Sequence, residues 1–428
     1  MLQVTIGFST LLFSLGLDQA YVREFHEVTD KPSLLKRALL PGLILLATTL
    51  LILLMFGDAL ASWLFEIPER HLSLLAATAL LAAFISRFLS LVLRMNEQGL
   101  AYSMTQLLPK LLLLAVLGTY VVVGAEKSLT NLVVANTSAL VFVCMVFSYN
   151  TRREWLASVK ASLDIQHLKH MLRFGLPLIL GGIAFWGLTT IDKIFLRTLA
   201  GFEELGLYSV AVSFAAAATI LQSVFSTVWA PTVYKWASKG EGLENVHKVS
   251  RYILALVVLA FCLAGLLSWI VTFVLPPQYD AVQWIVVSCL GFPLLYTLSE
   301  TTVVGIGISR RSGFAMLAAV LSFAINLVGN WLLIPHFGAA GAAVSTCISF
   351  WVFFVLRTEF SMYLWKSMPR LLPYTFTFFC VFGAVVFSLW GATLKELMVV
   401  YWMLLLCSAV YFFREEVMVS AFFLFRKS

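Results

Sequence analysis

Charged side chains are scarce in this sequence. Asp, Glu, Lys and Arg make up 12% of its 428 residues, whereas hydrophobic residues make up 61%. A soluble domain carries about 25% charged residues, so this chain has too little polar surface to coat a water-soluble particle. Its apolar residues form continuous runs, such as Leu39–Phe56 and Leu371–Trp390, each long enough to cross the roughly 30 Å hydrocarbon core as an α-helix. The sequence therefore predicts an all-α integral membrane protein.

Recognisable catalytic and metal-binding motifs are also lacking. The six cysteines lie in apolar runs without a CxxC pair, and the sequence contains no P-loop, HExxH, GxSxG or aspartate-rich motif. We therefore expect no enzyme activity, no metal site, no cofactor and no disulfide framework. One enzyme class that resides in membranes is the membrane glycosyltransferases and O-antigen polymerases. Such enzymes usually carry a sizeable extramembrane loop with catalytic residues. The outer loops expected here are short and nearly chargeless, which argues against this class.

The basic residues are distributed unevenly among the loops between the apolar runs. The runs predict about thirteen transmembrane helices. Alternate loops, starting with the one after the first run, carry 22 of the 29 Lys and Arg residues, and the opposite loops carry only four. Because cytoplasmic loops are enriched in Lys and Arg, the first set is expected to be cytoplasmic, together with the C-terminus. This distribution explains the net charge of +7 without a nucleic-acid partner.

The longest polar connection divides the chain into two lobes. We expect an N-terminal transmembrane lobe of five helices at 1–150 and a basic cytoplasmic connector at 151–173. A C-terminal lobe of six helices is expected at 174–360, followed by a two-helix hairpin and basic tail at 361–428. The division predicts two six-helix-type lobes, of which the first is incomplete.

The two lobes show a weak internal repeat at an offset of about 205 to 215 residues. SLVLRMNEQGLAYSM at 90–104 parallels GISRRSGFAML at 307–317, and an even number of helices in each repeat gives the two lobes the same orientation. The first helix of the second lobe, 174–196, has no counterpart in the first. We therefore expect this polypeptide to lack an N-terminal helix of about forty residues relative to a complete architecture, a length set by the repeat offset.

Three stretches resemble the polysaccharide exporters of the multidrug/oligosaccharidyl-lipid/polysaccharide superfamily. FGLPLILGGIAFWGLTTIDKIFLRTLAGFEELGLYSVAVSF at 174–214 resembles the start of their repeats. INLVGNWLLIPHFGAAGAAVST at 325–346 is similar to their N…L…IP.FG..GAA signature, and GLDQAYVREFHE at 16–27 is similar to the exit of their second helix. Within this superfamily, Wzx-type oligosaccharide flippases are the best match.

The resemblance implies a transporter that moves undecaprenyl-diphosphate-linked oligosaccharide repeat units across the bacterial inner membrane by alternating access. It would serve O-antigen, lipopolysaccharide or other polysaccharide biosynthesis, with lipid-linked oligosaccharide, membrane lipids and the polysaccharide polymerase machinery as partners. A gradient of H⁺ or Na⁺ would drive it. Another transporter of the superfamily, such as a lipid II flippase or a drug/cation antiporter, and a non-transporting truncated member remain alternatives.

Ionisable residues inside apolar runs are the candidates for a substrate cavity, because they are costly there unless they face a cavity or one another. Arg87 and Glu300 occupy equivalent places in the two repeats. We hypothesise that they face one cavity, with Arg87 attracting the diphosphate and Glu300 serving as its partner or as a protonatable site. The alternatives are a structural ion pair, or an Arg87 that reaches the membrane surface. The other cavity candidates are Lys110, Asp192 and Lys193.

One apolar run contains residues that can bend a helix. Pro177, Gly181 and Gly182 lie in the first helix of the second lobe. Proline removes a helical hydrogen bond, and breaks of this kind are tolerated in transmembrane helices where neighbours satisfy the freed groups. We interpret this helix as a candidate hinge, with ordinary close packing as the alternative.

Overall fold

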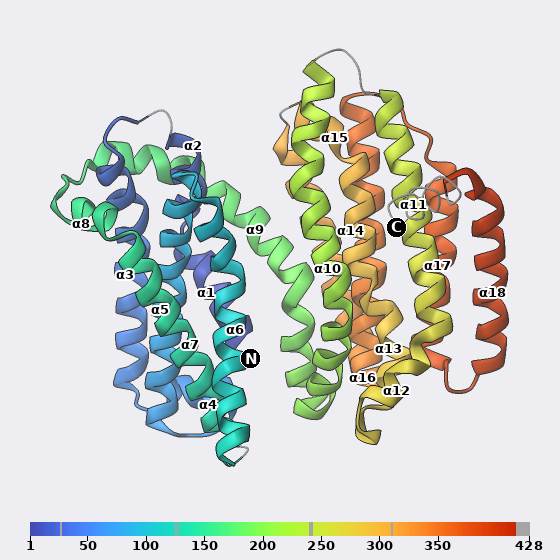
Figure 1. Ribbon diagram of the computed structural model, residues 1–428, viewed down its shortest axis with the longest axis horizontal. Helices are drawn as coiled ribbons and strands as arrows, with labels where there is room; N and C mark the ends of the chain where they lie inside the picture. The colour runs from blue at the N-terminus through green and yellow to red at the C-terminus, as the bar shows by residue number, and fades with distance from the viewer. Residues whose placement is uncertain (26–27, 125, 127, 239–242, 310, 417–428) are drawn as a thin grey trace. The chain divides into compact units, whose positions relative to one another are not determined.

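A computed structural model describes residues 1–25, 28–124, 126, 128–238, 243–309 and 311–416. Their regular structure is entirely helical, with no strand among these residues. The chain divides into two compact units, Met1–Ile183 (unit 1) and Ala184–Ser428 (unit 2), which are coloured from blue to green and from green to red in Figure 1. The predicted all-α fold is confirmed.

Unit 1 consists of long antiparallel helices with short helices at their ends (Figure 1). Its core is formed by leucine, alanine and phenylalanine side chains of α1, α2, α3, α4 and α5, with further contacts from the first turns of α9. The helices are α1 (Leu2–Phe13), α2 (Leu17–Glu24), α3 (Lys31–Met55), α4 (Ala59–Phe65), α5 (Arg70–Met95), α6 (Gly99–Val123), α7 (Leu129–Asn150), α8 (Arg152–Lys160) and α9 (Ile165–Leu199), the last of which continues into unit 2.

Local sequence signals explain several of these boundaries. Before α3, the Asp30 side chain accepts a hydrogen bond from the backbone N–H of Ser33, and before α7 the Ser128 hydroxyl does the same for Asn131. Such N-caps satisfy backbone donors that have no partner within the helix. Helix α6 ends at Gly124, whose φ of 70° is the left-handed conformation that favours glycine.

The break between α1 and α2 brings two backbones into direct contact. Gly16 has a φ of 67°, and a methyl group added there would lie 2.2 Å from the carbonyl oxygen of Gly175 on α9. Gly175 is equally restricted, because a methyl group on it would lie 2.7 Å from the carbonyl carbon of Gly16. Only glycine fits at this crossing, so the first part of α9 is closely packed within unit 1.

Unit 2 contains the remaining helices. A large core of buried residues from α9, α11, α13, α14, α16, α17 and α18 includes Phe261, Phe350, Phe354 and Trp402. The elements are α10 (Gly201–Ser238), α11 (Leu243–Leu267), the 3-10 helix η1 (Ser268–Ile270), α12 (Val271–Val274), the 3-10 helix η2 (Pro277–Tyr279), α13 (Val282–Cys289), α14 (Gly291–Thr302), α15 (Val304–Ile308), α16 (Ser312–Leu364), α17 (Leu371–Trp390) and α18 (Lys395–Phe412).

Helix α16 is two helices joined at a reversal. Gly338 has a non-helical backbone (φ 52°, ψ −128°), and the Glu204 carboxylate accepts a hydrogen bond of 2.7 Å from the backbone N–H of the next residue, Ala339. Glu204 lies in the first turn of α10, and its carboxylate thus stabilises the turn at Gly338. The two halves of α16 can therefore pack against each other inside unit 2.

Ten helices of the described residues are long and apolar enough to cross a membrane, and α16 is one of them. Helix α1 and the segment Leu107–Val123 of α6 are shorter apolar helices. These findings agree with a multi-pass membrane protein, whereas the count of about thirteen spans stays a prediction. The lobe boundaries expected from the sequence also stay a prediction. The two compact units of the structure meet at Ile183, inside α9.

The Gly16–Gly175 contact yields a stability prediction. Gly175→Ala should lower the melting temperature of the purified protein by several degrees, because forcing a methyl group into a well-packed contact costs about 1–3 kcal/mol. Gly118→Ala is the matched control: it also lies within a long helix, but a methyl group there meets no atom within 4 Å. A differential scanning fluorimetry series in one detergent compares them, and equal melting temperatures would contradict the close contact.

Candidate functional site

A buried polar cluster surrounds Asp192 in unit 2. The Asp192 side chain lies on the last turns of α9, and the residue is only 1% exposed. Its Oδ2 accepts hydrogen bonds from the hydroxyls of Tyr208 (2.6 Å) and Thr346 (2.8 Å), and its Oδ1 accepts one from the Asn330 amide (2.9 Å). All three of these partners are uncharged.

The kinked helix α16 supplies most of this cluster. Asn326 and Asn330 are four residues apart and therefore lie on one face of its first half. The reversal at Gly338 returns Thr346 to the same place, where it accepts a hydrogen bond of 3.1 Å from the Asn326 amide. The Asn330 amide also donates to the Asn326 Oδ1 (3.1 Å), while the buried Oδ1 of Asn330 has no hydrogen-bond partner.

The chemistry of the cluster suits a singly charged ion. A carboxylate buried among neutral partners is costly, and either a proton or a monovalent cation would remove that cost. The asparagine amides and the two hydroxyls each contain an oxygen with lone pairs, so rotation of these groups can convert hydrogen-bond donors into oxygen ligands. Oxygen ligands are those that hard cations prefer. The cluster therefore has the composition of a small-cation or proton site.

A second polar feature of unit 2 is a cavity of about 330 Å³ that contains an ion pair. Glu300 of α14 and Arg357 of α16 both line it, and their Oε1 and Nη2 atoms are 2.8 Å apart. Both side chains are nearly buried, with exposed fractions of 12% and 11%. Trp229, Gly307 and Ser312 form part of the remaining wall. Glu300 thus faces a cavity, within unit 2.

The Arg357 guanidinium is held on several sides. It donates a hydrogen bond of 2.6 Å to the Ser299 hydroxyl. It also lies over the rings of Phe353 and Tyr296, with distances of 5.0 and 5.3 Å to the ring centroids. Cation–π contacts of this kind stabilise a desolvated guanidinium. The geometry fixes Arg357 and, through it, the Glu300 carboxylate.

Arg87 has a partner in its own unit. Its Nη2 lies 3.1 Å from the Oδ2 of Asp18 on α2, and Asp18 is buried whereas Arg87 is half-exposed. Within their own units, Arg87 pairs with Asp18 and Glu300 pairs with Arg357, and the hypothesis that Arg87 and Glu300 face one cavity stays a prediction. Equivalent positions in a repeat do not determine which opposite charge lies within reach.

The model of one protein family matches more than half of the chain. The family is described as polysaccharide biosynthesis proteins, and the match covers residues 1–236. The chain belongs to the polysaccharide biosynthesis protein family. The resemblance to the polysaccharide exporters that the sequence motifs indicated is thereby confirmed.

Two individual proteins are similar to this member of the family. The "probable low-salt glycan biosynthesis flippase Agl15" of Haloferax volcanii is 24% identical over 235 residues, which are 53% of this chain and 49% of that protein. The chain thus spans about half the length of this curated relative. The solved structure of "lipid II flippase MurJ, inward closed conformation" matches with a TM-score of 0.69 at 13% identity and covers 97% of this chain and 92% of that one. At this identity the likeness shows the fold alone.

The other predicted residues of this family member are Lys193 in unit 2 and Lys110, Pro177, Gly181 and Gly182 in unit 1. Lys193 is half-buried next to Asp192 on α9, whereas Lys110 is exposed on α6. Pro177, Gly181 and Gly182 all lie inside α9, which is helical throughout, and a methyl group on Gly182 would touch a side chain of α1 at 3.0 Å. The roles of these residues as cavity lining and hinge stay predictions.

Several residues of the site were missed by reasoning from ionisable groups. Asn326, Asn330 and Thr346 are neutral, although all three lie in the quoted INLVGNWLLIPHFGAAGAAVST stretch. The apolar run expected at 339–356 leaves Arg357 in the cytoplasmic loop that follows, whereas α16 continues to Leu364 and buries it. Two asparagines four residues apart in an otherwise apolar helix were the signal that could have located the cluster.

The Glu300–Arg357 pair can be tested by a double-mutant cycle. Arg357→Met alone should destabilise the protein by about 3–5 kcal/mol, because it leaves a buried carboxylate without its partner. The double variant Arg357→Met/Glu300→Gln should recover most of that loss. The exposed pair Arg370–Glu359, also 2.8 Å apart, is the control, since exposed pairs contribute about 0–1 kcal/mol. The free energy of unfolding would be measured by chemical denaturation in micelles. If the single and double variants lose the same amount of it, a buried pair is contradicted.

Proposed function

We propose that the chain is a transporter that flips a lipid-linked glycan across a membrane. The proposal rests on membership in the polysaccharide biosynthesis family, on the many helices long enough to span a bilayer, and on a relative named as a probable flippase. The fold it shares with a lipid II flippase is in keeping with the proposal. The finer form of the proposal is an undecaprenyl-diphosphate-linked oligosaccharide repeat unit as substrate and the bacterial inner membrane as the location.

The buried Asp192 cluster is the observation that carries this proposal furthest. An ion-driven transporter needs a site where an ion changes the relative stability of two conformations. Asp192 joins α9, α10 and both halves of α16 through hydrogen bonds, so neutralising its charge changes the cost of holding these helices together. We propose that this cluster binds the coupling ion, either Na⁺ or H⁺.

Basic side chains are the groups expected to contact the diphosphate of the substrate. Arginine binds phosphate oxygens bidentately, whereas lysine offers a point charge. Arg357 faces the cavity of unit 2 and is held there by Glu300, and Arg87 is held half-exposed by Asp18. We propose that Arg87 and Arg357, with Lys110 and Lys193 as further candidates, provide positive charge along the substrate path.

Other members of the same class of transporter remain as second candidates. A drug/cation antiporter would bind cationic substrates and therefore place unpaired acidic groups in its cavity. The cavity of unit 2 instead contains a carboxylate that is already paired with an arginine, which argues against a cationic substrate. A lipid II flippase would differ from an oligosaccharide flippase in the glycan it accepts.

Complementation tests the proposed function directly. The full chain would be expressed in bacteria that lack either their oligosaccharide flippase or their lipid II flippase, with surface polysaccharide or growth as the readout. Restored surface glycan supports the oligosaccharide form of the proposal, and restored growth supports the lipid II form. If neither strain is restored while the protein is present in the membrane, and drug efflux rises instead, the flippase proposal is wrong.

The Asp192 cluster allows a more specific prediction. Asp192→Asn should reduce transport in the complemented strain by tenfold or more, because the variant keeps the shape of the side chain but has no charge to neutralise. In purified protein, added Na⁺ should raise the melting temperature of the wild type but not of Asp192→Asn, and lowered pH should raise that of the wild type more than that of the variant. Asp280→Asn removes an exposed carboxylate and is the matched control, expected to behave like the wild type. An Asp192→Asn variant with full transport would contradict the assignment of the coupling site.

A further inference from the structure

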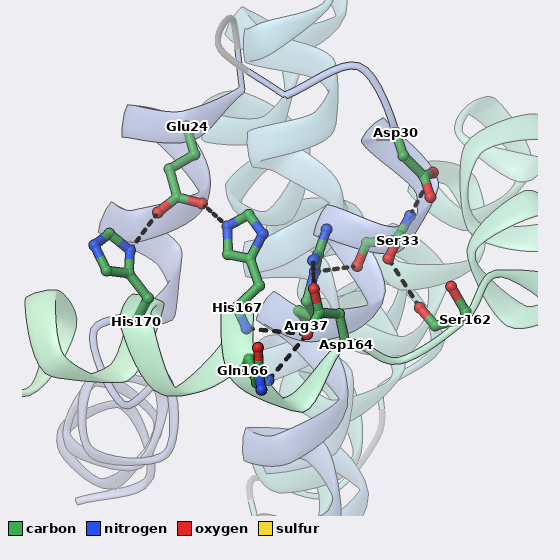
Figure 2. Close-up of polar contacts among 9 residues, drawn as sticks. All are labelled: Glu24, Asp30, Ser33, Arg37, Ser162, Asp164, Gln166, His167 and His170. Carbon is green, nitrogen blue, oxygen red and sulfur yellow. Dashed lines mark hydrogen bonds and ion pairs between the residues drawn. The ribbon is translucent and has the colours of Figure 1, made fainter.

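A separate cluster of ionisable residues lies in unit 1, between the end of α2 and the start of α9. Glu24 is the last residue of α2 and is buried. Its Oε2 lies 2.5 Å from the Nε2 of His167, and its Oε1 lies 3.6 Å from the Nδ1 of His170. Figure 2 shows both imidazoles reaching the same carboxylate from successive turns of α9. One carboxylate thus joins two titratable groups on the neighbouring helix.

The segment before α9 is fixed to unit 1 by contacts of a different kind. The Ser33 hydroxyl donates to the carbonyl of Ser162 (2.8 Å), and the Lys36 ammonium donates to the carbonyls of Val159 and Ala161. These bonds use backbone acceptors, so they do not change with pH near neutrality. In the following turns of α9, His167 and His170 add contacts to α2 that depend on charge.

Asp164 caps the first turn of α9. Its Oδ1 accepts hydrogen bonds from the backbone N–H groups of His167 (3.1 Å) and Gln166 (2.9 Å), and its Oδ2 is 3.8 Å from Arg37. The His167 N–H is the largest of several causes that lower the pKa of this carboxyl below its usual value. Asp164 therefore stays charged through the range in which histidine titrates.

The other charged groups near Glu24 are engaged elsewhere. On α2, Asp18 pairs with Arg87 of α5, and the Arg23 guanidinium lies 4.3 Å from the ring centroid of Phe174. Lys31 at the start of α3 lies over the ring of Phe25.

The charged groups of the two remaining elements do not bind Glu24 either. Glu154 of α8 accepts a hydrogen bond from Asn96. On α9, Lys169 and Arg173 are exposed. Among the residues that the structure describes, the salt-bridge partners of Glu24 are thus the two histidines.

We propose that Glu24, His167 and His170 form a pH-sensitive latch that holds the first turns of α9 against α2. When the histidines are charged, both form ion pairs with the buried Glu24 carboxylate. The His167 side chain is 27% exposed and makes the closer pair, whereas His170 is 71% exposed and solvent screens its weaker pair. When they are neutral, His167 can keep a hydrogen bond, but both ion pairs are lost. A fall in pH that charges the imidazoles therefore closes the latch, and a rise in pH that neutralises them loosens it.

The latch acts on the helix that also carries Asp192. Helix α9 runs without interruption from Ile165 to Leu199, with the histidines near its first turn and Asp192 near its last turns. Regulation of transport by the latch rests on the proposed function. The existence of the latch does not rest on it. If the chain is a flippase with this segment at the cytoplasmic face, cytoplasmic pH would control the mobility of the helix that carries the coupling ion.

Spin-label distances test the latch without any transport assay. Cysteines would replace the exposed Gln19 of α2 and Lys169 of α9, in a background in which the accessible Cys407 and Cys144 are serine. In the full chain in lipid nanodiscs, double electron–electron resonance should give a narrow distance distribution at pH 6 and a broader, longer one at pH 8.5. His167→Lys/His170→Lys, which keeps the positive charges, should stay narrow at both pH values.

Variants then assign the effect to these residues. Glu24→Gln and His167→Gln/His170→Gln should each give the same distribution at both pH values. His71→Gln is the matched control, because His71 forms an exposed pair with Glu69 at 3.0 Å, and it should keep the wild-type pH response. His26→Gln is also needed, since His26 is two positions from Glu24 and lies outside the described residues.

Three outcomes would overturn the latch: a wild-type distance that does not change with pH, an unchanged pH response in Glu24→Gln, or a response abolished by His26→Gln alone. Failure of the proposed function would be distinct. A protein whose distance responds to pH as expected, but which restores neither surface glycan nor growth in the complementation strains, would keep the latch and refute the flippase.

Discussion

The cost of placing charge in hydrocarbon is the constraint on which the rest of this structure depends. Insertion of a charged residue at the centre of a membrane helix costs about 3 kcal/mol or more, so every intramembrane charge needs a reason. Arg87 is balanced by Asp18, and Glu300 by Arg357. Asp192 is instead surrounded by hydroxyls and amides. The first two arrangements are neutral as they stand, whereas the hydrogen-bond partners of Asp192 are uncharged and leave its charge uncompensated.

The fold class and the family could be predicted from the sequence because both depend on features spread along the chain. Scarce charge and long apolar runs indicate membrane helices whatever their packing. The partners of Arg87 and Glu300 could not be predicted in this way, because an ion pair requires two side chains within 4 Å and that distance is set by how helices pack. Arg357 was misplaced for a related reason: hydropathy falls where polar residues begin, but α16 keeps its backbone hydrogen bonds as far as Leu364.

Neutral polar residues of the site could not be found from charge alone. Asn326, Asn330 and Thr346 carry no charge, so a search for intramembrane ionisable groups passes over them although they surround Asp192, one of the two carboxylates that such a search finds. Their importance depends on burial, since an amide or hydroxyl in hydrocarbon is costly unless hydrogen-bonded. Polar residues at helical spacing in an apolar segment are therefore informative even without charge, and Asp192 alone was an incomplete description of the site.

The reversal at Gly338 has a consequence for how this protein is made. Asn326 and Thr346 belong to one helical hairpin and hydrogen-bond to each other across it, so the hairpin can satisfy part of its own polar groups before the rest of unit 2 is present. Two spans that leave the ribosome in succession and enter the bilayer as a pair avoid exposing bare amides to lipid. Asp192 and Tyr208 are synthesised earlier and meet this hairpin on its arrival. All residues of the cluster precede α17 and α18 in the chain, so its hydrogen bonds can form before these last two helices complete the core of unit 2.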